Sequence, residues 1–152
     1  MAFASSFDAS IIVNDRADVA RMCGAGGVHV GQEDVSPGAA RAIVGPAAVV
    51  GYSTHSLDQV RAALAEPVSY VAVGPVFGTR TKDTGYGAVG LKLVAAAAQS
   101  DQAVPIVAIG GITLDNARSV VDAGAAAVAV ISDLLLTGDP CARTAAYLRA
   151  LA

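Results

Sequence analysis

The 152-residue sequence predicts a single α/β domain in which short parallel strands alternate with helices. Three observations support this fold class. Six short apolar runs recur along the chain, and segments with helical periodicity lie between them. The composition is rich in Ala and Val and has few aromatic residues (5%), which suits buried strands covered by closely packed helices. Polar residues gather where the apolar runs end.

The expected strands lie within residues 10–16, 27–34, 48–56, 70–82, 104–113 and 127–133. Helices are expected between them. Segment 18–26 ends in glycine, segment 56–67 begins with a serine cap and ends before Pro67, and segment 114–124 closes at Gly124. Successive strands are about 20 residues apart, except for one longer unit that carries a loop over residues 74–87. Repeated βα units of this kind predict a parallel sheet.

Composition also narrows the class of protein. The net charge is −3 with no basic stripe, so nucleic acid is not an expected partner. No apolar run approaches the roughly 18–20 residues needed to cross a bilayer, and the first residues do not resemble a secretory signal. Cys23 and Cys141 show no metal or redox spacing, which favours reduced thiols. We therefore expect a cytoplasmic protein with no membrane partner.

Polar or glycine residues end nearly every predicted strand. They are Asn14, Asp15, Gln32, Asp34, Ser53, His55, Thr79, Lys82, Gly110, Gly111 and Ser132. Both (β/α) barrels and open doubly wound sheets bind ligands at the carboxyl ends of their strands, so this placement predicts a site without separating the two folds. A complete barrel has eight strands, whereas the sequence shows six.

Asp15 and Asp34 end two successive predicted strands. Neighbouring strands lie about 4.8 Å apart, so the two carboxylates could share a cation. Mg²⁺ suits such a site, because it takes one or two carboxylates and completes its shell with water and substrate phosphate. The alternative is that each aspartate caps the helix that follows it, which for Asp15 begins near Ala17. The pattern alone leaves both interpretations open.

Two glycines precede the helix expected near Leu114, within GGIT (110–113). They would let backbone amides approach an anion at the helix terminus. The last strand ends at Ile131-Ser132, and loops after the final two strands of such barrels frequently bind phosphate. The alternative is a tight turn with Ser132 as an ordinary helix cap.

The loop over residues 74–87, GPVFGTRTKDTGYG, offers the Thr79 and Thr81 hydroxyls and the Lys82 charge to phosphate oxygens. Neither histidine completes a catalytic triad. His29 lies mid-strand and is expected to be packed rather than catalytic, whereas His55 could be either. Because no nucleophile stands with a base and an orienting acid, we expect a site that acts through charge, with a metal and phosphate contacts.

The segments IIVNDRADVA, GGVHVGQED, VVGYSTHSL, VGPVFGTRTK, IVAIGGIT and VAVIS, in this order and spacing, closely resemble the thiamine-phosphate synthase family. The resemblance runs from about Ser10 to the end of the chain. It implies a TIM (β/α)8 barrel, as a single partial domain over residues 1–152. Family members begin with two further strands, the second ending in a Gln/Arg/Lys cluster. We therefore expect an N-terminally truncated barrel of about six βα units.

The resemblance implies a transferase of thiamine biosynthesis. The family condenses 4-amino-2-methyl-5-(diphosphooxymethyl)pyrimidine with a thiazole phosphate, giving thiamine phosphate and pyrophosphate by way of a pyrimidinyl carbocation. Asp15 and Asp34 resemble the Mg²⁺ ligands, while Asn14 and Lys82 resemble residues that hold the pyrimidine diphosphate. Ser53 resembles a pyrimidine contact, and Asn14, Ser53 and Lys82 would be the catalytic residues. The residues that resemble the thiazole-phosphate site are Thr79, Thr81, Gly111, Ile131 and Ser132.

Two other functions stay open. Thiazole tautomerase resembles the chain in fold and in GGIT, but it lacks the paired acidic positions and the loop that carries Lys82. A non-catalytic phosphate-binding fragment is the second alternative. In each case the expected partners are small molecules, and a homo-oligomeric state stays open.

Overall fold

The computed structural model describes residues 4, 6–7, 9–79, 85–100 and 103–152. The strands are β1 (Ile12–Asn14), β2 (Gly27–Val30), β3 (Val49–Thr54), β4 (Tyr70–Val73), β5 (Ile106–Ile109) and β6 (Ala127–Ala129). The helices are α2 (Ala17–Cys23), α3 (Pro37–Val44), α4 (Leu57–Leu64), α5 (Gly90–Ser100), α6 (Leu114–Asp122), α7 (Ser132–Leu135) and α8 (Pro140–Leu151). Each strand lies within one of the six predicted apolar runs, so the predicted alternation is confirmed.

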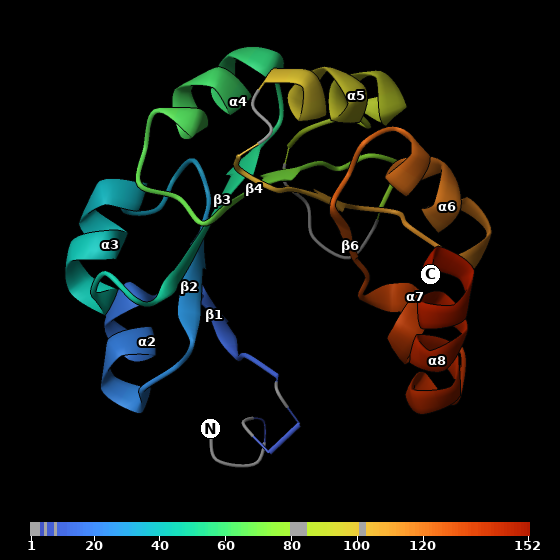
Figure 1. Ribbon diagram of the computed structural model, residues 1–152, viewed down its shortest axis with the longest axis horizontal. Coiled ribbons are helices and arrows are strands. Elements are labelled where there is room, and N and C mark those ends of the chain that lie inside the picture. The colour runs from blue at the N-terminus through green and yellow to red at the C-terminus, as the bar shows by residue number, and fades with distance from the viewer. Residues whose placement is uncertain (1–3, 5, 8, 80–84, 101–102) are drawn as a thin grey trace.

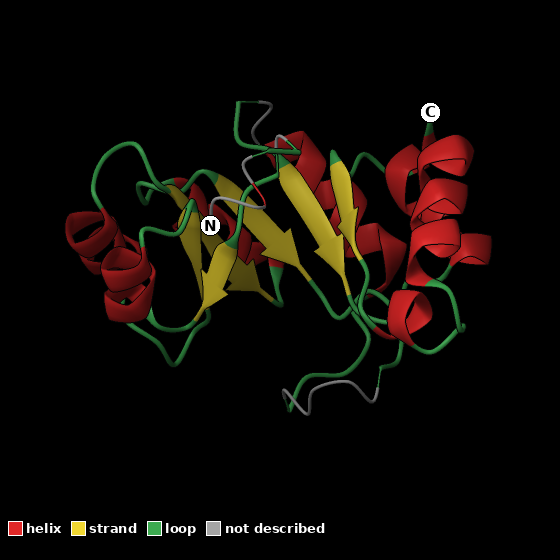
Figure 2. Cartoon of the chain, turned by 90° about the horizontal axis from the view of Figure 1, so that it is seen from below, coloured by secondary structure: helices red, strands yellow, loops and turns green. Residues whose placement is uncertain are grey.

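The six strands are parallel and follow one another in sequence order, β1-β2-β3-β4-β5-β6. The sheet curves, and the helices cover its outer, convex side (Figure 1). Figure 2 shows the strand arrows side by side, with their arrowheads toward the same side of the molecule. A doubly wound sheet would reverse its strand order and carry helices on both faces. The described chain is therefore a curled half-barrel of six βα units, as predicted.

The hydrophobic core lies between the sheet and its helices. Buried aliphatic side chains alternate along the strands, including Val28 and Val30 of β2 and Val71 and Val73 of β4, each fully buried. Successive residues of a strand point to opposite faces, so the residues between these valines face the concave side of the sheet. This alternation places small and polar side chains on the inside of the half-barrel.

Helix ends follow local sequence signals. The Ser56 hydroxyl accepts a hydrogen bond from the Gln59 backbone N–H at 3.2 Å, which confirms the predicted serine cap of α4. Helix α2 ends at Gly24, which has the left-handed φ of 64° that glycine adopts readily. No helix within the described residues is long and apolar enough to span a membrane.

Candidate active site

A cavity of about 1020 Å³ lies at the carboxyl ends of the strands, on the concave side of the sheet. The predicted site residues that line it are Asn14, Asp15, Ser53, Thr79, Gly111, Ile131 and Ser132. They come from the ends of β1 and β3 and from the segments after β4, β5 and β6. The parallel sheet thus brings residues from distant parts of the chain to one edge. Thr81 and Lys82 lie outside the described residues.

Asp15 directly follows β1. Its backbone N–H donates to the His29 carbonyl oxygen at 2.7 Å, so the pairing with β2 continues through this residue. Its φ is 64°, a left-handed conformation that aspartate tolerates better than most non-glycine residues. Arg16 rather than Asp15 is the N-cap of α2, so the interpretation of Asp15 as a helix cap is wrong. Asp15 instead lines the cavity.

Asp34 belongs to the turn that follows β2. Its Oδ2 accepts a hydrogen bond from the Gly31 backbone N–H at 2.7 Å. Ser36 caps α3, so the helix-cap interpretation is also wrong for Asp34. Asp34 does not line the cavity, whereas three other residues of the turn do: Gly31, Gln32 and Glu33.

The two aspartates can be compared with what Mg²⁺ requires. No group of three or more His, Cys, Asp or Glu side chains within the described part of the chain could hold a metal. Mg²⁺ needs fewer protein ligands, because water and substrate phosphate complete its octahedral shell. Asp15 lines the cavity, and Asp34 Oδ1 has no hydrogen-bond partner among the described residues. Asp15 therefore offers Mg²⁺ a hard oxygen donor within the cavity, and Asp34 offers one from the turn whose residues Gly31, Gln32 and Glu33 line it.

Gly110 and Gly111 form the turn after β5, with φ values of 99° and 64°. The Phe77 backbone N–H donates to the Gly110 carbonyl oxygen at 3.0 Å, which joins this turn to the loop after β4. A Cβ atom on Gly111 would lie 2.6 Å from the Gly78 carbonyl oxygen and 2.8 Å from the Phe77 Cβ. Both the dihedral angle and the close approach therefore require glycine at position 111.

Helix α7 begins at Ser132, and Ile131 is its N-cap, so the interpretation of Ser132 as the cap is wrong. A bidentate ion pair ties α7 to α8, since Asp133 accepts two hydrogen bonds from Arg143, each 2.9 Å long. The Tyr147 hydroxyl donates a third at 2.6 Å. The Arg143 hydrogen bonds hold the pKa of Asp133 below its ordinary value. This network fixes the segment that carries Ile131 and Ser132 at the edge of the cavity.

His29 lies mid-strand and half-buried, as predicted, but it also lines the cavity. Its Nε2 is 2.8 Å from the Ser53 Oγ, and its Nδ1 is 2.9 Å from the Tyr70 hydroxyl. The sequence carried a signal for this position: Val28 and Val30 pack outward against the helices, so His29 must face inward.

Two further side chains shape the cavity. The His55 Nδ1 is 2.5 Å from the Gly74 carbonyl oxygen, and its ring stacks on Tyr86 with centroids 3.8 Å apart. Gln32 Nε2 donates to the Ser53 carbonyl oxygen at 2.6 Å. His55 therefore joins the end of β3 to the loop after β4, and Gln32 joins the turn after β2 to β3.

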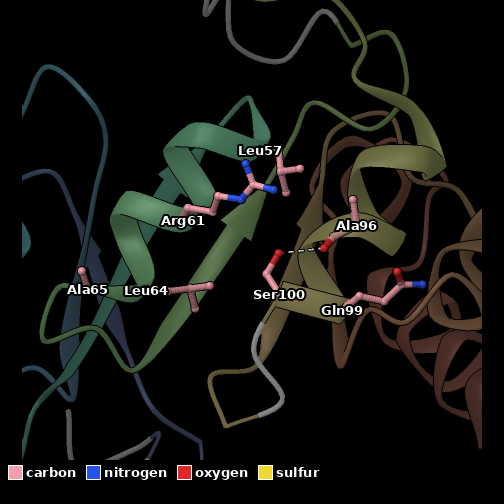
Figure 3. Close-up of a pocket in the computed structure, with 7 residues that line it drawn as sticks. All are labelled: Leu57, Arg61, Leu64, Ala65, Ala96, Gln99 and Ser100. Carbon is pink, nitrogen blue, oxygen red and sulfur yellow. Dashed lines mark hydrogen bonds between the residues drawn. The ribbon is translucent and has the colours of Figure 1, made fainter.

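A second cavity of about 710 Å³ lies between α4 and α5, on the outer side of the half-barrel (Figure 3). Its lining residues are Leu57, Arg61, Leu64, Ala65, Ala96, Gln99 and Ser100. The Ser100 hydroxyl donates to the Ala96 carbonyl oxygen at 2.9 Å, and Arg61 pairs with Asp58 of its own helix. This cavity contains none of the predicted site residues, so the candidate site is the one at the strand ends.

The chain resembles known proteins over most of its length. A family model described as thiamine monophosphate synthase matches residues 1–134. Thiamine-phosphate synthase of Koribacter versatilis is 47% identical over 144 residues, which are 95% of this chain and 67% of that protein. The synthase of Azorhizobium caulinodans is 46% identical over 129 residues, which are 85% of this chain and 60% of that protein.

A solved structure, thiamine phosphate pyrophosphorylase from Pyrococcus furiosus, superposes with a TM-score of 0.90 at 33% identity. The superposition covers 99% of this chain and 71% of that one. Among the curated relatives, the chain spans 67% of the Koribacter versatilis protein, 60% of the Azorhizobium caulinodans protein and 61% of the Anaeromyxobacter dehalogenans protein. The family model and these relatives confirm the resemblance seen in the sequence motifs: the chain belongs to the thiamine monophosphate synthase family.

Proposed function

We propose that the chain carries the substrate-binding edge of a thiamine-phosphate synthase. The enzyme would join 4-amino-2-methyl-5-(diphosphooxymethyl)pyrimidine to a thiazole phosphate, giving thiamine phosphate and pyrophosphate. The observation that carries this proposal is the cavity at the strand ends, which is lined by predicted residues from β1, β3 and the segments after β4, β5 and β6. A cavity of about 1020 Å³ has room for two small substrates side by side.

The pyrimidine diphosphate would bind near the ends of β1 and β3. Asn14 would hold the diphosphate and Ser53 the pyrimidine ring, since both line the cavity from these strands. Asp15 and Asp34 would hold Mg²⁺, whose charge would offset the negative charge that collects on the departing diphosphate. Lys82 would add a point charge to the same phosphate oxygens.

The thiazole phosphate would bind at the other end of the cavity. The φ angles of Gly110 and Gly111 turn the chain after β5 at the edge of the cavity, and the absence of a side chain at Gly111 lets the loop after β4 pack closely against this turn. The Thr79 and Ser132 hydroxyls line the same cavity and can donate to phosphate oxygens.

The proposed reaction needs positioning and charge stabilisation more than proton transfer. The bond between the pyrimidine methylene carbon and the diphosphate oxygen breaks, and its electron pair leaves with pyrophosphate. The thiazole nitrogen then gives its lone pair to the methylene carbon and forms the new carbon–nitrogen bond. The chain's residues would hold both substrates in line and exclude water from the cation. The lack of a Ser/His/Asp triad in the motifs agrees with this chemistry.

Thiazole tautomerase, the rival function, does not account for the acidic positions. An isomerisation of a thiazole phosphate requires no diphosphate and hence no paired carboxylates for Mg²⁺. Asp15 lines the cavity in a left-handed conformation that serves no helix cap, so its placement favours the synthase.

Titration calorimetry with the pyrimidine diphosphate, with and without Mg²⁺, tests the proposal. We expect binding that depends on Mg²⁺, and we expect Asp15→Asn and Asp34→Asn each to weaken it by at least about tenfold, because each loses a charged metal ligand. Asp58→Asn is the matched control, since Asp58 lies on the outer helix α4 and should leave binding unchanged. Equal affinity with and without Mg²⁺, or wild-type binding by both variants, would contradict the assignment.

A further inference from the structure

The sheet register places four residues in one row across the first four strands. Asn14 pairs with His29, His29 with Gly51, and Gly51 with Tyr70. Gly51 stands between the two ring-bearing residues, and a Cβ atom there would overlap the Cζ and the hydroxyl oxygen of Tyr70. The Tyr70 side chain therefore crosses β3 over Gly51. Its ring reaches the His29 ring on β2 and stacks on it, with centroids 5.6 Å apart and planes 16° apart.

A chain of hydrogen bonds continues from this row to the cavity. The Tyr70 hydroxyl lies 2.9 Å from His29 Nδ1, and His29 Nε2 lies 2.8 Å from Ser53 Oγ. Ser53 is two residues after Gly51 on β3, so both face the concave side. His29 and Ser53 line the cavity, whereas Tyr70 does not, so Tyr70 can act on a ligand only through His29.

The chemistry of Tyr70, His29 and Ser53 determines which group donates in each of these hydrogen bonds. Burial raises the pKa of Tyr70, so its phenol stays protonated at neutral pH. A phenol donates a hydrogen bond more readily than it accepts one, and a neutral imidazole accepts at only one nitrogen. With Tyr70 donating to Nδ1 of His29, the ring hydrogen is on Nε2 and is donated to Ser53 Oγ. Ser53 then keeps its own hydrogen for an acceptor in the cavity.

We propose that Tyr70 and His29 are positioning residues that make Ser53 a hydrogen-bond donor toward a ring nitrogen of the ligand. The inference rests on the proposed function, because the aminopyrimidine is the nitrogen heteroaromatic expected beside Ser53. It adds a statement about ligand specificity: the cavity should bind a ring that presents an unprotonated nitrogen to Ser53 more tightly than an isosteric ring that presents C–H. Gly51 serves the same purpose by leaving room for Tyr70.

The tautomer of His29 tests the arrangement in the ligand-free protein. The chain contains two histidines, so ¹⁵N-histidine NMR spectra can be assigned with a His55→Gln variant. We expect His29 above pH 7 to carry its hydrogen on Nε2. Tyr70→Phe should shift the tautomer ratio toward Nδ1–H by about 3- to 10-fold, the effect of one hydrogen bond.

Tyr52→Phe is the matched control, because Tyr52 is the neighbouring β3 residue that packs against the helix-side core. It should leave the His29 signals in place. Gly51→Ala, which displaces the Tyr70 ring, should reproduce the spectrum of Tyr70→Phe. A wild-type ring protonated on Nδ1, or a Tyr70→Phe spectrum identical to the wild type, would overturn the inference.

Ligand binding gives a second readout. For the pyrimidine diphosphate with Mg²⁺, we expect Ser53→Ala and Tyr70→Phe each to weaken affinity by about 3- to 10-fold. In the Ser53→Ala background, Tyr70→Phe should have no further effect, because the two residues act in series. An analogue with C–H in place of the ring nitrogens should bind wild type and variants alike.

Independent, additive losses in the double variant would overturn the inference. If the wild-type chain does not bind the pyrimidine diphosphate at all, the proposed function fails. The tautomer measurement still decides whether Tyr70 sets the state of His29, since it requires no ligand.

Discussion

Gly111→Val is expected to abolish binding of the thiazole phosphate, with a loss of at least about 100-fold in affinity. Two physical effects combine at this position. Valine is strongly disfavoured at a φ of 64°, and its Cβ would lie 2.6 Å from the Gly78 carbonyl oxygen. The turn after β5 and the loop after β4 must therefore separate, and the backbone no longer approaches the phosphate. Calorimetric titration with the thiazole phosphate measures the loss.

Binding of the pyrimidine diphosphate provides the internal comparison, because that ligand is assigned to the ends of β1 and β3. It should change much less in Gly111→Val. Gly45→Val is the matched control: Gly45 has a φ of 94° at the end of α3, and a Cβ atom there would meet nothing within 4 Å. It introduces similar backbone strain away from the cavity. Equal loss of both ligands in Gly111→Val would point to a folding defect instead.

Asp133→Asn is expected to lower the melting temperature by about 4–8 °C, because it removes the charge that holds Arg143 and Tyr147. The Asp133 side chain is only 12% exposed, so water replaces the lost interactions poorly. Its pKa is held below the ordinary value, chiefly by Arg143. The carboxylate therefore stabilises the fold above the ordinary aspartate pKa of about 4, and this contribution is lost as the pH falls through the lower folded-state pKa.

Thermal melts of both proteins from pH 7 downward check the sign. The difference between wild type and Asp133→Asn should stay constant to about pH 5 and shrink below about pH 4. Asp122→Asn serves as the control, because its ion pair with Arg118 on α6 is about 60% exposed on both sides and contributes little. A difference that grows in acid would show that the Asp133 carboxylate does not stabilise the fold.

The strands of this protein could be predicted because each of them lies in a short run of apolar, mostly aliphatic residues. The pattern around Val28 and Val30 fixes the strand and its parity, and parity alone places His29 on the concave side. The predicted serine cap at Ser56 is confirmed, since a serine directly before a segment with helical periodicity commonly accepts a hydrogen bond from the first turn of the helix. Clustering of the site residues followed from parallel strands that share one carboxyl edge.

Other features depend on contacts that no local pattern encodes. Asp15 lies shortly before a helix, where aspartate is a common N-cap. In the structure, its backbone N–H pairs with the His29 carbonyl oxygen and its φ is left-handed, so Arg16 is the N-cap of α2. Asp34 also lies shortly before a helix, but Ser36 caps α3, and the Asp34 carboxylate accepts a hydrogen bond from Gly31 within the turn. The link from Tyr70 to His29 requires the register of three strands, which the spacing of apolar runs fixes only within a residue or two.

The sequence order of the strands has a consequence for how the chain folds. Each of the strands β2 to β6 pairs with the strand that precedes it along the chain, so each of these pairings closes a loop of one βα unit. The entropy of loop closure rises by only about 0.6 kcal/mol for each doubling of loop length, and the longer unit between β4 and β5 therefore costs little more than the others. Among the six described strands, no pairing requires a segment more than one βα unit away. Adjacent units can consequently dock one after another as the chain leaves the ribosome, with each finished strand serving as the template for the next.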